Sequence, residues 1–131
     1  MKDLTDADFK AWPNFTRTEL ACKCGCGQCR MDPKFMDILQ SIRLAYDQPM
    51  QITSGYRCSE HNEAVSSTGN GGPHTTGRAV DIGCRGANAL NLLAIAIRHG
   101  ISGVGVSQKG ESRFLHLDDA PVNPRPAIWS Y

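Results

Sequence analysis

The segment that decides the fold is GGPHTTGRAVDIGC, residues 71–84, in which a glycine-rich turn leads into a short apolar run. The run AVDIGC alternates as a half-buried strand does, with apolar side chains on one face and Asp81 on the other. His74 precedes Asp81 by seven residues. On a helix that spacing would separate the two side chains by about 10 Å along the axis. A loop that folds back over the strand through the TTG turn brings them together instead.

A second strand with the same alternation is predicted at RFLHLD, residues 113–118. Its two leucines share one face, and His116 and Asp118 share the opposite face. Each of the two strands therefore buries an apolar face and presents polar side chains on the other. We expect these polar side chains to converge, with His74 in the loop that feeds the first strand.

His74, Asp81 and His116 together form a donor set that suits Zn²⁺. Three protein ligands leave one coordination position for water, as catalytic zinc sites do, whereas structural sites use four protein ligands. Zinc of this kind lowers the pKa of its water and polarises a carbonyl, which is the chemistry of amide hydrolysis. Spacing alone leaves an ordinary alternative open, because a histidine near a turn and an aspartate on a solvated strand face are common without a metal.

The remaining segments predict a small α+β fold. Asp32 followed by Pro33 marks the start of an amphipathic helix over 33–47. We expect an antiparallel sheet with helices packed on one face and a zinc cleft on the other. The other expected elements are a strand from 50 that ends at Gly55, a short helix over 59–65, a loop over 66–78, a helix over 87–100, a strand over 103–106, and a tail that packs Ile128 and Trp129 against the core.

Length and charge limit the classes of partner. The 131 residues suit one domain, 1–131, with an N-terminal extension at 1–14 and a cysteine-rich loop at 22–29. The net charge is +1 and no segment concentrates Lys or Arg, so we expect no nucleic acid partner. The longest apolar run, ALNLLAIAI, is far shorter than the ~20 residues of a membrane span, so we expect no membrane insertion. We also expect a monomer.

Six cysteines are many for a chain of this length. Four of them lie close together in CKCGCGQC: Cys22, Cys24, Cys26 and Cys29. The last two of these have the spacing of a zinc knuckle, whereas the first two are closer than usual. A second, structural zinc ion and a disulfide framework that includes Cys58 and Cys84 are equally open, and free thiols are a third alternative. No cysteine has an obvious base beside it, so none is expected to act as a nucleophile.

Four segments, in this order, resemble one family of enzymes: FTRTELACKCGCG at 15–27, TSGYRCSEHN at 53–62, HTTGRAVDI at 74–82 and FLHLDDAPVNPRPAIWSY at 114–131. Together they closely resemble the zinc D-Ala-D-Ala carboxypeptidase and L-alanyl-D-glutamate endopeptidase family of peptidoglycan peptidases. The likeness is strongest to its short single-domain members, many of which come from phages and prophages. The resemblance implies that His74, Asp81 and His116 hold the zinc ion. It also implies that Arg57 binds a carbonyl or carboxylate of the substrate.

The general base is where this sequence departs from the family pattern. Many relatives place an acidic residue or a histidine three or two positions before the last zinc ligand, where this chain has Arg113 and Phe114. Asp118 is therefore our candidate for the base, and Glu111 and His61 are lesser candidates. The alternative for Asp118 is a supporting role, in which its carboxylate orients a ligand histidine.

The expected function is that of a zinc-dependent peptidase that hydrolyses a peptide bond in peptidoglycan stem peptides, as a phage or prophage endolysin. One alternative is a D-Ala-D-Ala carboxypeptidase of cell-wall maturation. Another is a zinc-containing binding domain without turnover, as in the hedgehog-related fold. The polar start MKDLTDADFKAWP shows no export signal, so we expect synthesis in the host cytoplasm and action on the wall after release, or carriage on a virion.

Overall fold

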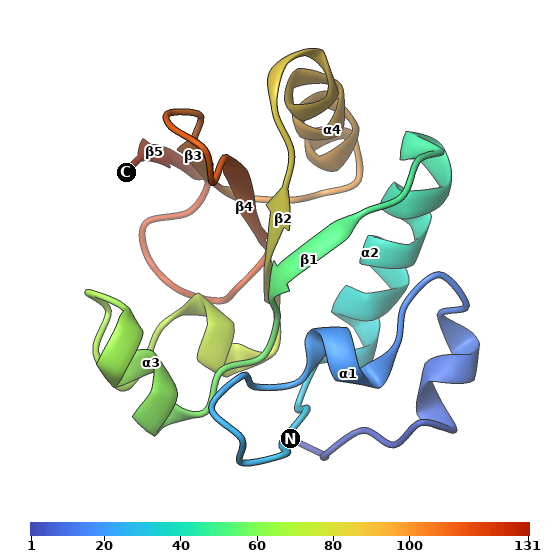
Figure 1. The fold of residues 1–131 in the computed structure, drawn as a ribbon, viewed down its shortest axis with the longest axis vertical. Helices are drawn as coiled ribbons and strands as arrows, with labels where there is room; N and C mark the ends of the chain where they lie inside the picture. The colour runs from blue at the N-terminus through green and yellow to red at the C-terminus, as the bar shows by residue number, and fades with distance from the viewer.

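The computed structural model describes residues 1–131 as an α+β fold built on one five-stranded sheet (Figure 1). The strands are β1 (Gln51–Ser54), β2 (Ala79–Gly83), β3 (Gly103–Ser107), β4 (Phe114–Asp118) and β5 (Ala127–Ser130). Their order is β1-β2-β4-β3-β5, and all neighbours pair antiparallel except β3 and β5, which are parallel. The fold class predicted from the sequence is therefore confirmed.

Two long helices pack against one face of this sheet: α2 (Pro33–Tyr46) and α4 (Gly86–Arg98). The short helices are η1 (Asp8–Ala11), α1 (Arg17–Leu20), α3 (Ser59–Val65) and η2 (Pro73–Thr76), where η marks a 3₁₀ turn. In Figure 1, α2 and α4 lie side by side to the right of the sheet, whereas α3 lies beyond the end of β1. None of the helices has the length and apolar character that crossing a membrane requires.

The core lies between these two helices and the apolar faces of the strands. Val80 and Ile82 of β2 and the leucines of β4 are at most 2% exposed, as the period-2 alternation predicts. They meet the buried side chains of the helices: Phe35, Leu39, Ile42, Leu92 and Ala96. The opposite face of β2 and β4 is left to the polar side chains.

The helix α2 begins and ends where local chemistry indicates. The Asp32 carboxylate accepts the backbone N–H groups of Lys34 at 2.8 Å and Phe35 at 3.2 Å, with a proline at the first helical position. The helix ends at Tyr46, and Asp47 takes a left-handed conformation with φ 54°. The predicted helix is thus confirmed to within a residue.

The two ends of the chain contribute more structure than the sequence indicated. Leu4, Phe9 and Trp12, in the expected N-terminal extension, are all buried in the core. The tail forms β5, in which Trp129 lies opposite a glycine of β3. Ile128 is 68% exposed, so the prediction that it packs against the core is wrong. A parallel edge strand alternates its two faces, and here only one of them is covered.

Candidate metal centre

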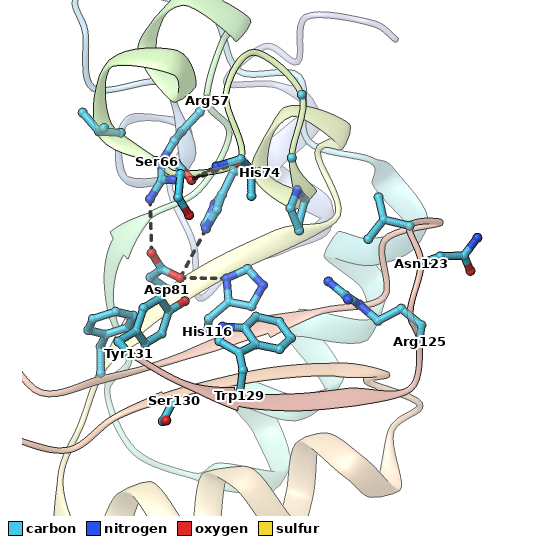
Figure 2. A pocket seen from close by; sticks show the side chains of 18 residues that line it. Arg57, Ser66, His74, Asp81, His116, Asn123, Arg125, Trp129, Ser130 and Tyr131 are labelled. Atoms are coloured by element: carbon cyan, nitrogen blue, oxygen red, sulfur yellow. Dashed lines mark hydrogen bonds and ion pairs between the residues drawn. The ribbon is translucent and has the colours of Figure 1, made fainter.

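Three polar side chains meet on the sheet face opposite α2 and α4 (Figure 2). His74 comes from η2, and Asp81 of β2 and His116 of β4 are direct cross-strand neighbours. Asp81 Oδ1 lies 3.2 Å from His74 Nε2 and 3.0 Å from His116 Nδ1. All three residues are buried, and we call them the histidine cluster. The residues singled out by spacing are therefore brought together by the fold.

The hydrogen-bond partners of the ring nitrogens indicate what the histidine cluster can bind. His74 Nδ1 lies 2.8 Å from the carbonyl oxygen of Gly55, which only accepts, so this nitrogen carries a proton. His116 Nε2 lies 2.6 Å from Asp118 Oδ2 and donates to it in the same way. When both rings are neutral, the nitrogens that face Asp81, His74 Nε2 and His116 Nδ1, carry no proton. Each then points a lone pair at a carboxylate oxygen. Three acceptors facing one another call for positive charge between them, as ring protons or as a metal ion, and two imidazoles with one carboxylate suit zinc.

The electrostatics of the cluster also favour positive charge. Burial acts to raise the pKa of the Asp81 carboxyl, but His116 and His74 outweigh it and hold this pKa well below its usual range. Burial acts to lower the pKa of His116, but Asp118 and Asp81 outweigh it and raise this pKa. The Asp81 carboxylate is therefore held in its anionic form, and its surroundings favour positive charge at His116. A divalent cation bound between these side chains would supply that positive charge.

A single glycine lets the loop return over the strand. Gly77 follows η2 with a left-handed φ of 74°, and a Cβ there would collide with the carbonyl oxygen of Arg30. The Gly77 carbonyl in turn accepts the N–H of Asp32 at 2.9 Å. This turn places His74 above Asp81, as the TTG sequence predicted.

Arg57 reaches the same site from the segment between β1 and α3. Its guanidinium donates to Ser54 Oγ at 3.0 Å, to Asn62 Oδ1 at 3.3 Å and to Asp81 Oδ2 at 3.3 Å. Three of its five N–H groups are thereby used, and the remainder stay available on a side chain that lines the cleft. Arg57 is positioned as the sequence indicated, and its role towards substrate stays a prediction.

Asp118 has the contacts that the second of its two predicted roles would need. It is fully buried, and Oδ2 accepts from His116 Nε2. Arg125 donates to both carboxylate oxygens, at 2.9 and 2.8 Å, and the N–H of Ala120 donates to Oδ1 at 3.2 Å. Burial acts to raise the pKa of Asp118, but His116 and Arg125 outweigh it and lower this pKa. A carboxylate so fully engaged, and absent from the cleft wall, favours the role of orienting His116 over the role of base, and its part in catalysis stays a prediction.

The lesser candidates for the base also lie away from the cluster. Glu111 is an exposed residue of the turn between β3 and β4, where its carbonyl accepts from Arg85. His61 lies on α3 and does not line the cleft. Asp81, a member of the histidine cluster, is the only acidic side chain on the cleft wall. The geometry therefore supports none of the three bases predicted from the sequence.

The histidine cluster lies at the wall of a cleft of about 720 Å³. One side is formed by the loop before η2, from Ser66 to Gly72, and the other by Phe114, Trp129 and Tyr131. Figure 2 shows the Trp129 indole beside His116, with a distance of 5.2 Å between ring centroids. The cleft is thus large enough for a segment of peptide and is bordered by aromatic rings.

Sequence reasoning missed Arg125 and the cleft-facing role of Trp129. The Arg125 guanidinium lies 5.0 Å from the centroid of the indole and pairs with Asp118 beneath it. The sequence signal that could have revealed them is the alternation of glycine and valine in GVGV, in β3. A Cβ at Gly103 would collide with Asp118 and Arg125, and one at Gly105 with the indole. Glycine at alternate positions marks a strand face over which other side chains lie closely.

The cysteines group differently from the expectation. Cys22, Cys24 and Cys26 gather with Cys58 at the start of α3, and we call these four the cysteine cluster. Cys29 is fully buried in the core and does not join them, which corrects the grouping predicted from CKCGCGQC. The fourth member lies 36 residues from Cys22, a distance in sequence that no local spacing reveals.

The fold and the donor set define a protein with a candidate metal centre at the wall of a cleft. A family model described as Peptidase M15 matches residues 13–118, and the chain belongs to this family of metallopeptidases. Membership implies a peptide substrate. The matched region contains Arg57 and the whole histidine cluster, and it stops before β5. A search of curated proteins found no match.

Proposed function

We propose that this protein is a zinc-dependent peptidase that hydrolyses a peptide bond in the stem peptides of peptidoglycan. The observation that carries the proposal is the convergence of two histidine ring nitrogens and one carboxylate oxygen beside an open cleft. Membership of the M15 family and the sequence resemblance to peptidoglycan peptidases support the substrate class.

Each residue around the site has a defined task in this reaction. Zinc held by the histidine cluster supplies the Lewis acidity that amide hydrolysis needs. Gly55 and Asp118 hold the two rings in the tautomers that leave one nitrogen of each free. Arg57 has unused N–H groups with which to bind a carbonyl or carboxylate of the peptide, and a charge-assisted bond of this kind is stronger than a neutral one.

The proposal also includes a biological setting for the enzyme. The likeness to short phage and prophage enzymes supports an endolysin, made in the host cytoplasm and acting on the wall after release or from a virion. A second candidate is a zinc-containing binding domain without turnover. The observation that favours this second candidate is the cleft wall, which offers no acidic side chain besides Asp81.

Digestion of purified peptidoglycan by the zinc-loaded protein tests the proposal, with mass spectrometry of the released muropeptides. Cleavage at one bond within the stem peptide is the expected result, and loss of only the terminal D-alanine identifies a carboxypeptidase. The His74→Ala variant serves as the inactive control. If the wild type binds zinc but cuts no bond in walls of several chemotypes, the binding domain is the correct function.

A further inference from the structure

The cysteine cluster has the geometry of a metal site that is separate from the histidine cluster. Cys22 Sγ lies 3.5 Å from Cys24 Sγ and 3.7 Å from Cys58 Sγ, and Cys24 Sγ lies 3.7 Å from Cys58 Sγ. All four sulfurs, that of Cys26 included, lie within 4.8 Å of one another. Tetrahedral coordination with Zn–S bonds of about 2.3 Å places sulfurs about 3.8 Å apart. The three measured edges are close to this value.

The near-equal distances also argue against a disulfide arrangement. A disulfide joins two sulfurs at about 2.05 Å and turns them away from any third. Here three sulfurs form an almost equilateral triangle, so no pair among them is singled out. Four convergent thiols in one place are what a soft-ligand metal site requires.

Backbone N–H groups already point at the sulfurs. The N–H of Cys58 donates to Cys22 Sγ at 3.4 Å, and the N–H of His61 donates to Cys58 Sγ at 3.4 Å. Such donors stabilise the negative charge of a thiolate and orient it, as the groups around a metal centre do. In the loop, Gly25 and Gly27 have left-handed φ values of 90° and 76°, which lets the chain reverse tightly around its cysteines.

We propose that Cys22, Cys24, Cys26 and Cys58 form a tetrathiolate site that holds a structural zinc ion. Four protein ligands complete a tetrahedral shell and leave no position for water or substrate, so this site is not a second centre of hydrolysis. Thiolates select zinc over magnesium or calcium, which prefer oxygen. The ion fastens the 22–26 loop to the first turn of α3.

The metal content of purified variants tests this proposal without any peptidase assay. The wild type is expected to carry about two zinc ions per chain, and the double variant His74→Ala/His116→Ala about one. Cys58→Ser is expected to lose one zinc ion relative to the wild type. Cys29→Ser, which removes a buried cysteine outside the cysteine cluster, is the matched control and is expected to keep both.

Cobalt substitution gives a second readout that identifies the ligands. Co²⁺ in a tetrathiolate site shows sulfur-to-metal charge-transfer absorption in the near ultraviolet, and this band is expected in the His74→Ala/His116→Ala variant. The variant therefore keeps the test valid even if Cys58→Ser fails to fold.

Two results would overturn the proposal. The first is a double variant that binds no metal and shows no charge-transfer band. The second is a disulfide among the four cysteines in protein prepared with zinc in air without reductant, detected by mass spectrometry after alkylation. Either result leaves the proposed peptidase activity intact, because that activity rests on the histidine cluster.

Discussion

The histidine cluster and the cysteine cluster differ in the number of their donors and in what supports them. The first has three donors, set on two paired strands and a turn, buried beside a cleft. The second has four sulfurs on a loop and a helix start, and two of its cysteines are exposed. Three protein donors leave one coordination position open, whereas four protein donors close the shell. The comparison separates a site for chemistry from a site for structure.

Removal of a member of the histidine cluster should have the largest effect. His116→Ala deletes a candidate metal donor and leaves the buried Asp118 carboxylate without its ring partner, so peptidase activity is expected to fall to background. Metal analysis is expected to show loss of one zinc ion while the thiolate-to-cobalt band remains. If His116→Ala kept peptidase activity, the histidine cluster would not be the catalytic site, and the proposed difference in function between the two clusters would be wrong.

The Asp118→Asn variant should have a smaller effect, of a kind that identifies the role of this residue. An amide holds the His116 tautomer poorly, and loss of a partner of this type costs about 10–100-fold in metal affinity or activity. Activity measured at low zinc is therefore expected to fall and to recover at saturating zinc. A general base cannot be replaced by extra metal, so a defect that persists at saturating zinc would restore Asp118 as the base.

Loss of the cysteine cluster should reach the cleft through the segment 55–58. Cys58 follows Arg57, and the N–H of Arg57 bonds to the carbonyl of His74 at 3.2 Å. Cys58→Ser is expected to loosen Arg57 and to raise KM by about tenfold, the value of one charge-assisted hydrogen bond. The zinc of the histidine cluster should stay bound.

A double-mutant cycle checks this coupling between the sites. If Cys58→Ser acts through Arg57, the variant Cys58→Ser/Arg57→Ala should be hardly worse than Arg57→Ala alone. Additive losses would show that the two sites are independent. Cys84→Ser is the control, because the Cys84 sulfur bonds only to a backbone carbonyl, and this variant should leave both KM and kcat unchanged.

The smallest effect is expected at the wall shared by the sheet and the cleft. Gly105→Ala adds a methyl group against the Trp129 indole, and the ring can shift towards the cleft, so the free energy of unfolding should fall by about 1 kcal/mol. Urea unfolding measures this change. Gly71→Ala meets no atom within 4 Å and is the matched control. A loss of several kcal/mol would mean that the indole supports the fold as well as the cleft.

Local patterns selected the members of the histidine cluster, and the family resemblance favoured a metal site over the ordinary alternative. Alternation in β2 and β4 places Asp81 and His116 on the polar faces of their strands, and the TTG turn accounts for His74. Each of these assignments depends only on residues that are close in sequence, so it does not require knowledge of the rest of the fold. The capping of α2 by Asp32 succeeds for the same reason.

Contacts between distant segments could not be predicted in this way. Cys58 replaces Cys29 in the cysteine cluster because the loop folds onto α3, and no spacing within CKCGCGQC contains that information. The pairing of β5 with β3, and of Arg125 with Asp118, likewise depends on the path of the tail. The role of Asp118 was left open for this reason, since its partners decide whether its oxygens are free.

The two rings of the histidine cluster are held by partners of different kinds. The Gly55 carbonyl belongs to the main chain, so no side-chain replacement there deletes the acceptor that holds His74. Asp118 is a side chain, and one substitution removes the acceptor that holds His116. One ligand is therefore secured by the path of the backbone and the other by the identity of a residue. A substitution of Asp118 removes its acceptor directly, whereas a substitution of Gly55 keeps the carbonyl and acts only by pressing a Cβ against the backbone of Leu20.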